Sequence, residues 1–373
     1  MKASDSFADA EISRARRYHR PLYVALFADW ALQLALLAAI AFGPPGDWLW
    51  AATGGPWWAR TLELTALVLA VSTVIRLPLS AWRGWVWERR WKFSTQSLGA
   101  WLGDVAKGLS LGAVLTGLGL TALVWTARVW PTWWPAPAAL GAAALALLLS
   151  LLAPLLFERL FNRFQPLADE ALARDLRELS ERAGVPVRTT LVADASRRTT
   201  KHNAYVSGLG PTRRLVLYDT LLRDSPVPEL RGVVAHELGH RRFGHVARGT
   251  ALAMLGAVAA VFALRVVFAW DGLVEAAGAD GPGDPRIVPL VLLVLWLLGV
   301  GALPFETWLS RRWERAADRF AVELTHDAET MERMHRRLAL ANLADLDPPR
   351  WVYLLLFTHP TPPERIAAAR MYA

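Results

Sequence analysis

Long apolar stretches alternate with short polar segments along most of this chain. Six of these stretches have about the 20 residues that a helix needs to cross the hydrocarbon core of a bilayer. They run from Leu22 to Phe42, from Thr61 to Trp82, and over residues 108–127, 137–157, 249–270 and 287–305. The pattern therefore predicts six transmembrane helices.

Residues 158–248 differ, because their pattern is that of a domain that folds in water. Residues 169–183 have helical periodicity and are followed by Gly184 and Pro186, which usually stop a helix. Three short runs of residues are typical of strands and cover Val187–Val192, Ala204–Ser207 and Arg214–Tyr218. The turn residues Gly208 to Pro211 join the last two of these runs, so a hairpin is expected there.

This pattern divides the chain into four parts. Residues 1–157 hold an N-terminal polar segment and the first four transmembrane helices, and residues 158–248 form the small helix-and-sheet domain. Residues 249–309 hold the last two transmembrane helices, and residues 310–373 form a C-terminal helical region. The predicted fold class is an α-helical integral membrane protein with a small cytoplasmic α+β domain.

Composition supports a membrane protein and narrows the possible chemistry. The 373 residues are 54% hydrophobic and include 19 Trp, which is too apolar for an ordinary soluble enzyme. The chain has no Cys, which excludes a cysteine nucleophile, disulfides and thiolate metal sites and leaves His, Glu and Asp as ligands. The net charge of +8 does not indicate a nucleic-acid binder, because the arginines cluster beside the apolar stretches.

The positions of the basic residues predict the orientation of the helices. Cytoplasmic loops carry the excess of Arg and Lys, so the basic segments and both termini are expected inside the cell. No small-residue cleavage site follows the first apolar stretch, so the N-terminal segment is not expected to be a cleaved signal. The segments rich in Arg and Lys are 1–21, 83–107 and 158–248, whereas residues 43–60, 128–136 and 271–286 hold one Arg each.

Trp residues and charged residues mark particular places in the predicted bundle. Seven Trp fall in the outer loops, as in an interfacial belt of anchors: Trp48, Trp50, Trp57, Trp58, Trp130, Trp133 and Trp134. Four ionisable residues fall inside the predicted spans: Asp29, Glu63, Arg76 and Arg265. A charge in lipid costs several kcal/mol, so these four are expected to pair with one another or to face a polar cavity.

The candidate chemistry centres on the motif His236-Glu237-Leu238-Gly239-His240, inside a segment from Pro228 to His245 that has the pattern of a helix. At helical spacing His236 and His240 lie one turn apart, so both imidazoles leave the same face and can hold one metal ion. Glu237 lies roughly 100° around the helix, where it reaches a water on the metal but is poorly placed as a third ligand. A helix with two chance histidines is the alternative, and the apolar flank of the segment weighs against it.

A catalytic zinc site needs a third protein ligand and leaves a fourth position for water. His245 follows His240 by five residues, about 140° around a helix, so the spacing is wrong for a ligand and predicts a structural role. After the sixth span, Arg311–Asp318 has the pattern of a helix at the cytoplasmic membrane surface. Glu314 and Asp318 share one face of it, where Glu314 could complete the zinc shell while Asp318 receives the second N–H of a zinc-bound histidine. The surrounding residues by themselves are more typical of a solvated helix of mixed charge, so the third ligand stays open at this point.

Five motifs are spread over most of the chain. They are Thr95-Gln96-Ser97-Leu98 running on to Asp104 and Lys107; Asn203-Ala204-Tyr205 with Arg213 to Leu222; His236 to His240; Glu314 with Asp318; and His359-Pro360 followed by Glu364-Arg365. Together they resemble the type I CaaX prenyl endopeptidase family of integral-membrane zinc metallopeptidases, in its shorter prokaryotic form.

This resemblance implies specific roles for the residues of the motifs. It implies one Zn²⁺ on His236, His240 and Glu314, with Asp318 and Arg365 supporting the ligands. It implies that Asn203, Ala204 and Tyr205 form the edge that pairs with a peptide substrate, and that His359 lies near the scissile carbonyl. It also implies a water-filled chamber within the helices; the further N-terminal helix of eukaryotic members is not expected here.

The expected function is that of a zinc-dependent endopeptidase in a prokaryotic cell membrane, with Glu237 as general base. Residues 158–248 would then form a cytoplasmic, zincin-like metallopeptidase domain. The expected partners are membrane lipids and membrane-associated or hydrophobic peptides and proteins. Prenylated CaaX-type chains are one possible class of substrate, although no residue of the sequence indicates recognition of a prenyl group. Nucleic acid is not an expected partner. Two alternatives are a quality-control protease resembling the heat-shock protease HtpX, with four spans, and a non-enzymatic membrane carrier or receptor with a structural zinc.

Overall fold

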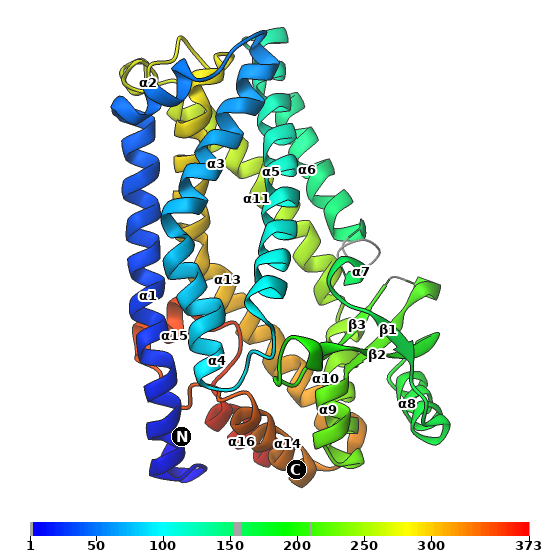
Figure 1. Ribbon diagram of the computed structural model, residues 1–373. Coiled ribbons are helices and arrows are strands. Elements are labelled where there is room, and N and C mark those ends of the chain that lie inside the picture. The colour runs from blue at the N-terminus through cyan, green and yellow to red at the C-terminus, as the bar shows by residue number, and fades with distance from the viewer. Residues whose placement is uncertain (1–2, 153–157, 209, 373) are drawn as a thin grey trace.

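The computed structural model describes residues 3–152, 158–208 and 210–372 of the chain (Figure 1). Within them, six helices are long and apolar enough to cross a membrane, which confirms the predicted number. The predicted end of the fourth span, residues 153–157, lies outside the described residues. The six helices are α1 (Asp9–Phe42), α3 (Trp57–Ala81), α5 (Leu98–Val129), α6 (Pro135–Leu152), α11 (His245–Val267) and α13 (Val288–Thr325).

Several of these helices extend well beyond their apolar stretches. The longest, α13, has 38 residues and continues through Pro304 to Thr325. At 1.5 Å per residue it is about 57 Å long, whereas the hydrocarbon core is about 30 Å thick, so its C-terminal part projects beyond the bilayer. The separate surface helix expected at Arg311–Asp318 is therefore the continuation of the sixth span. Residues 306–310 contain no Gly or Pro that would separate the two, and Pro304, near the end of the predicted span, does not end the helix.

The helices pack as a bundle around an apolar core at the end opposite the sheet. Contacts between α3 and α5 and between α6 and α11 hold neighbouring helices together. Trp134 belongs to this core, because it is buried against Phe268, and so it is not the interfacial anchor that its loop position suggested. Trp48 and Trp133, by contrast, are more than two-thirds exposed, as expected of a belt.

Two of the four intramembrane charges form a pair in the bundle. The guanidinium of Arg76 on α3 donates to the carboxylate of Asp29 on α1 through Nε and Nη2, at 2.8 and 2.6 Å. Both side chains line a cavity of about 640 Å³. Glu63 instead accepts a hydrogen bond from the backbone of Gly54, between α2 and α3. Arg265 is exposed in the last turn of α11, and the partner or polar cavity expected for it stays a prediction.

The small domain contains a four-stranded sheet with strand order β1-β2-β4-β3. Strands β3 (Ala204–Ser207) and β4 (Arg214–Tyr218) form the predicted antiparallel hairpin, and β2 pairs with β4 in parallel. Strand β2 (Thr189–Ala193) begins two residues later than expected. Strand β1 (Phe164–Pro166) was not predicted, because it has only three residues and contains a Pro, which is confined to sheet edges.

Shorter helices complete the two ends of the molecule. Both termini, the sheet and the short C-terminal helices lie at one end, and α2 lies at the other (Figure 1). The shorter helices are α2 (Pro44–Ala51), α4 (Glu88–Arg90), α7 (Glu158–Phe161), α8 (Glu170–Arg182), α9 (Asp219–Asp224), α10 (Val227–Arg242), α12 (Asp271–Ala276), α14 (Ala328–Ala341), α15 (Arg350–Leu356) and α16 (Pro362–Met371). Single 3₁₀ or π turns are η1 (Ala3–Asp5), η2 (Trp82–Trp87), η4 (Ala195–Arg197), η5 (Gly210–Thr212) and η6 (Pro285–Ile287).

Candidate metal centre

Helix α10 carries the His-Glu-Leu-Gly-His motif and lies against both the sheet domain and α13. Its residues Val234 and Leu238 are fully buried in the core that also contains the strands. On the side toward α13, Gly239 allows close approach: a Cβ atom at this position would lie 3.1 Å from the Cα of Ala317. The absence of a side chain at Gly239 therefore sets how near the histidines come to α13.

Helix α10 ends earlier than expected, at Arg242 rather than at His245. Gly244 follows in the left-handed region, with φ of 65°, and His245 is the first residue of α11. Glycine adopts this conformation at little cost, so Gly244 is a usual place for one helix to end and another to begin. The chain changes direction here, and helical spacing no longer relates His245 to His240.

Three side chains from two helices converge in the way that the sequence predicts. The Nε2 atoms of His236 and His240 lie 3.1 Å apart. Glu314 on α13 reaches both, with its Oε2 3.3 Å from His236 Nε2 and its Oε1 3.2 Å from His240 Nε2. One ligand atom from each of the three residues lies within 4.8 Å of the others, as a shared metal ion requires.

The chemistry of this cluster fits a metal cation. Glu314 is buried, and within the described part of the chain its Oε2 has no hydrogen-bond donor. A buried carboxylate oxygen without a donor is costly, whereas a cation among the three groups would satisfy it. Two imidazole nitrogens and one carboxylate are a donor set that zinc prefers. The residues present therefore fit a zinc ion.

The outer nitrogen of each histidine also has a partner. Asp318, one turn beyond Glu314, places its Oδ1 2.8 Å from His236 Nδ1. His240 Nδ1 lies 2.9 Å from Nδ1 of His245, whose ring stacks on Trp313 with a centroid distance of 5.0 Å. Such contacts fix the tautomer and the ring orientation of a metal-binding histidine. The sequence suggested this arrangement for Asp318, but it did not suggest the contact between His245 and His240.

Arg365 braces the carboxylate of Asp318 from α16. Its Nε and Nη2 donate to Oδ2 and Oδ1 of Asp318 at 2.8 and 2.5 Å, and its Nη2 lies 3.7 Å from Glu314 Oε2. Burial favours the neutral form of His236, but the Asp318 and Glu314 carboxylates outweigh it and raise the pKa of His236 to about 10. The field at His236 therefore favours a positive charge, whether a proton or a metal cation.

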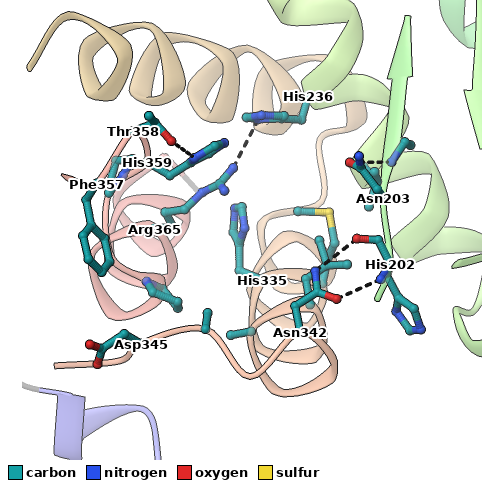
Figure 2. Close-up of a pocket in the computed structure, with 18 of the residues that line it drawn as sticks. His202, Asn203, His236, His335, Asn342, Asp345, Phe357, Thr358, His359 and Arg365 are labelled. Atoms are coloured by element: carbon teal, nitrogen blue, oxygen red, sulfur yellow. Dashed lines mark hydrogen bonds between the residues drawn. The ribbon is translucent and has the colours of Figure 1, made fainter. Parts of the chain in front are cut away.

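His335 on α14 is a further buried group that no motif indicated. Its Nε2 lies 3.6 Å from Asp318 Oδ1, too far for a hydrogen bond, and has no other hydrogen-bond partner among the described residues. Burial lowers the pKa of His335 to about 3, so it is neutral. It lies beneath Arg365 at the wall of the cavity beside the cluster (Figure 2).

Glu237 and His359 also line this cavity, which has a volume of about 510 Å³. His359 Nε2 lies 3.3 Å from Glu314 Oε1, and Thr358 contacts its Nδ1 at 2.9 Å. Burial lowers the pKa of His359 and raises the pKa of Glu237. A buried carboxylate with a raised pKa is a better proton acceptor than an exposed one.

The start of strand β3 lies across the cavity from His359 and Arg365 (Figure 2). Asn203 and Ala204 line the cavity, whereas the backbone of Tyr205 faces Val216 of β4. The amide oxygen of Asn203 accepts a hydrogen bond from the backbone N–H of Ala204 at 2.9 Å. Every residue that the sequence assigned to the site therefore lies in or next to one region of the molecule.

Comparisons with known proteins agree with this geometry. The model of "Peptidase family M48" matches residues 166–373. The model of "CAAX prenyl protease N-terminal, five membrane helices" matches residues 2–163. Within the described part of residues 2–163, four helices are long and apolar enough to cross a membrane. The resemblance that the five motifs predicted is confirmed by these two matches.

Individual relatives give the same result. The chain is 27% identical over 372 residues to the uncharacterized metalloprotease YhfN of Bacillus subtilis, covering 99% of this chain and 86% of the relative. It is 26% identical over 326 residues to CAAX prenyl protease 1 of Saccharomyces cerevisiae, covering 83% and 72%. The crystal structure of S. mikatae Ste24p has the same fold, with a TM-score of 0.85 and 24% identity over 98% of this chain and 90% of that one. Since the M48 model alone matches more than half of the residues, the chain is a multi-pass membrane metalloendopeptidase that belongs to peptidase family M48.

Proposed function

We propose that this protein is a zinc-dependent endopeptidase that holds one Zn²⁺ on His236, His240 and Glu314 and cleaves membrane-associated or hydrophobic peptide chains. The observation that carries the proposal is the convergence of these three side chains on one point, around a buried carboxylate oxygen that lacks a donor. Glu237 lies beside this point in a cavity large enough for a peptide segment. A zinc ion bound there would supply a polarised water whose pKa is lowered to about 7.

Glu237 is the proposed general base. It takes a proton from the attacking water and passes it to the amine that leaves when the peptide bond breaks. On α10, His236 and His240 face Glu314 and form the proposed metal cluster, whereas Glu237 lines the cavity beside them. Burial raises the pKa of Glu237, which strengthens it as a base.

His359 and Asn203 are proposed to stabilise the negative charge that develops on the scissile carbonyl oxygen. They line the same cavity from opposite sides, so a peptide between them can meet both. Arg365 and Asp318 are proposed to position His236 through the bidentate contact between them. Hydrogen-bond donors that are already positioned for the developing negative charge, as proposed for His359 and Asn203, typically make the largest single contribution to the rate enhancement.

The open edge of β3 is proposed to bind the substrate backbone. Asn203 O accepts from Tyr218 N of β4, and alternate residues of an antiparallel strand face the same partner. The backbone groups of Ala204 and Val206 therefore face the open edge, where Arg241 Nε already donates to Val206 O at 3.0 Å. This leaves Ala204 O and Val206 N–H to pair with an extended peptide, which would bind largely independently of its side chains.

The finer assignments of location and organisation are also proposals. The metal cluster and both termini are proposed to lie on the cytoplasmic side of a prokaryotic cell membrane, and the basic segments support this side. Residues 158–248 are proposed as the zincin-like metallopeptidase domain and residues 310–373 as the region that supplies the third ligand. The six candidate membrane spans do not favour the alternative of an HtpX-like quality-control protease, for which four spans were expected. The non-enzymatic alternative is wrong, because the chain belongs to a peptidase family.

Replacing Glu237 with Gln tests the proposal directly. The variant is expected to keep its zinc, measured by elemental analysis of the purified protein, and to lose cleavage by about 10³-fold, in the range typical of a general base. Full activity in Glu237→Gln would exclude Glu237 as the base. Loss of zinc from this variant would instead indicate that Glu237 has a ligand role.

Lipidated substrates are a second, narrower proposal. It is supported by the relatives named CAAX prenyl protease 1 and by the match of the corresponding N-terminal model. The purified protein would be offered the same peptide with and without a prenyl group, with Glu237→Gln as the inactive control. Equal rates would show that the lipid is not recognised, while faster cleavage of the prenylated peptide would support the proposal.

A further inference from the structure

Three arginines from three separate connections meet at the end of the bundle opposite the metal cluster. Arg60 lies in the first turn of α3, Arg128 at the end of α5, and Arg286 in η6 just before α13. All three line one cavity of about 850 Å³. From Arg286 to Glu314 the chain follows η6 and α13, which at 1.5 Å per residue is roughly 40 Å. The cavity is therefore remote from the proposed catalytic site.

The sequence makes this meeting unusual. Residues 43–60, 128–136 and 271–286 each contain a single basic residue, and those residues are Arg60, Arg128 and Arg286. Loops on the outer side of a membrane usually contain few basic residues. Here the fold brings all three of them to one place.

The guanidiniums are held on tryptophans rather than on carboxylates. Arg60 and Arg286 both lie over the ring system of Trp50, at 4.6 and 4.8 Å, and Arg128 lies over Trp57 at 5.4 Å. Cation–π contacts of this kind favour each arginine singly. Two positive groups over one ring nevertheless repel each other, so an anion between them would stabilise the arrangement.

Few of the N–H groups of these three guanidiniums donate hydrogen bonds to other described residues. Arg128 Nη1 donates to Gly283 O at 2.9 Å and Arg286 Nη1 to Gly278 O at 3.3 Å, whereas Arg60 Nε is buried without an acceptor in the described chain. Over residues 3–152, 158–208 and 210–372, no carboxylate forms an ion pair with any of the three guanidiniums. A buried N–H without an acceptor is a costly group, so an acceptor in the cavity would stabilise it.

Two aspartates also line the cavity, but they do not neutralise it. Asp284 accepts backbone N–H bonds from Arg286 and Asp280 at 2.9 and 3.0 Å, so its carboxylate is largely occupied. Asp280 is exposed at the edge. Three arginines against two aspartates leave a net positive charge in a cavity with unused N–H donors.

We propose that this cavity binds a phosphate-bearing anion, and that an anionic lipid headgroup is the source which its position favours. Arginine recognises phosphate through a planar pair of N–H donors, and three such groups surround the space. Trp50 lies in α2 and Trp57 begins α3, at the end of the bundle where aromatic rings are expected to lie at the level of the headgroups. The site is independent of the proposed proteolytic chemistry.

Native mass spectrometry of the purified protein would test this. The protein is mixed in detergent with equal amounts of phosphatidylglycerol and phosphatidylcholine of the same acyl chains, and the retained lipid is counted. A triple variant, Arg60→Gln with Arg128→Gln and Arg286→Gln, is compared with a control of equal charge change on the exposed face of the small domain, Arg174→Gln with Arg177→Gln and Arg188→Gln. The single change Arg60→Gln is included, because this arginine has no hydrogen bond to lose within the described residues and so disturbs the fold least. A second arm replaces the lipids with inorganic phosphate.

The proposal expects the wild type and the control to retain phosphatidylglycerol preferentially, and expects the preference to fall about tenfold or more in the triple variant, in line with the attraction of each arginine to anionic lipid. Arg60→Gln should lower it severalfold. Binding of inorganic phosphate that is lost in the triple variant, without a lipid preference, would support the anion site and assign a free ion as its source. Equal retention of both probes by the wild type, Arg60→Gln and the triple variant would overturn the proposal.

Discussion

Glu314 is the residue on which the proposed metal site depends most, because it is the only one of the three ligands that comes from a different helix. Its carboxylate lies 3.3 and 3.2 Å from the two histidine nitrogens. Replacing it with Ala removes one of three ligands and leaves the imidazoles with an incomplete shell. Glu314→Ala is expected to lower zinc affinity by at least about 100-fold, measured by competition with a chromogenic chelator.

The matched control for Glu314 is Glu323→Ala on the same helix. Glu323 is exposed and, among the described residues, forms its ion pair with Arg319, at 2.8 Å, so its removal changes the charge by the same amount without touching the cluster. Zinc affinity should remain at the wild-type level in this control. A Glu314→Ala protein with normal zinc content and normal activity would refute the ligand assignment.

His245 contacts a proposed metal ligand, His240, in a way that the sequence did not indicate. Counting five positions along one helix places it about 140° from His240, and this argument predicted a structural role. Helical spacing does not apply here, because the helix ends at Arg242 and Gly244 turns the chain, so His245 reaches Nδ1 of His240 from the next helix. The structural role itself stays a prediction. Spacing rules hold only within one element, and the turn at Gly244 could not be located from the pattern alone.

Exchanging His245 for Phe separates its two contacts. Phe keeps a ring that can stack on Trp313 but lacks the nitrogen that contacts His240. Loss of such a supporting hydrogen bond typically costs 10–100-fold in metal affinity, so we expect a decrease of about 10-fold. His245→Gln, which keeps a hydrogen-bonding group, should recover part of the affinity. Wild-type affinity in His245→Phe would show that the stacking alone is important.

Helices α10 and α13 approach each other closely at Gly239. A Cβ added at Gly239 would lie 3.1 Å from Ala317 Cα and 3.3 Å from Ala317 O, and backbone atoms cannot move aside easily. Gly239→Ala is therefore expected to push the two helices apart. We expect the free energy of unfolding to fall by about 1–3 kcal/mol and the zinc affinity to fall with it.

Gly232 on the same helix provides the comparison. A Cβ there would meet Met331 Sδ at 2.9 Å and Met334 Sδ at 3.0 Å, which belong to flexible side chains that can change rotamer. Gly232→Ala should therefore cost less than Gly239→Ala and leave zinc affinity unchanged. Thermal unfolding in detergent and chelator competition measure the two effects. Equal losses from both substitutions would show that helix approach at Gly239 does not set the metal geometry.

Element types were more predictable than element ends. The six spans and strands β3 and β4 follow from hydrophobic period and length, which the bilayer and the sheet impose directly. The ends of α13 and β2 depend on tertiary packing, because an apolar span continues as a helix wherever neighbours cover its polar extension. For this reason Glu314 and Asp318 were expected on a separate surface helix, although their spacing, one turn apart, was right.

Two sites of the molecule differ in how far the sequence predicts them. The convergence of His236, His240 and Glu314 could be expected from motifs, because metal chemistry restricts which residues can work together. The proximity of Arg60, Arg128 and Arg286 could not be expected, since each is the single basic residue of its own sequence segment and only the packing of α3, α5 and η6 brings them together. A site made by packing alone leaves no spacing in the sequence to find.

The charges of the loops predict the orientation of the whole bundle, and single cysteines can test this prediction, because the natural chain has none. Ser13 near the start of α1 and Thr132 between α5 and α6 are both exposed, and they lie near opposite ends of the bundle. The basic segments should stay in the cytoplasm, so a membrane-impermeant maleimide is expected to label Thr132→Cys in intact cells and Ser13→Cys only after permeabilisation. The cysteine-free wild type controls for background labelling. The reverse pattern would place the metal cluster outside the cell and Arg60, Arg128 and Arg286 at the inner leaflet, so proteolysis and lipid binding would each face the other compartment.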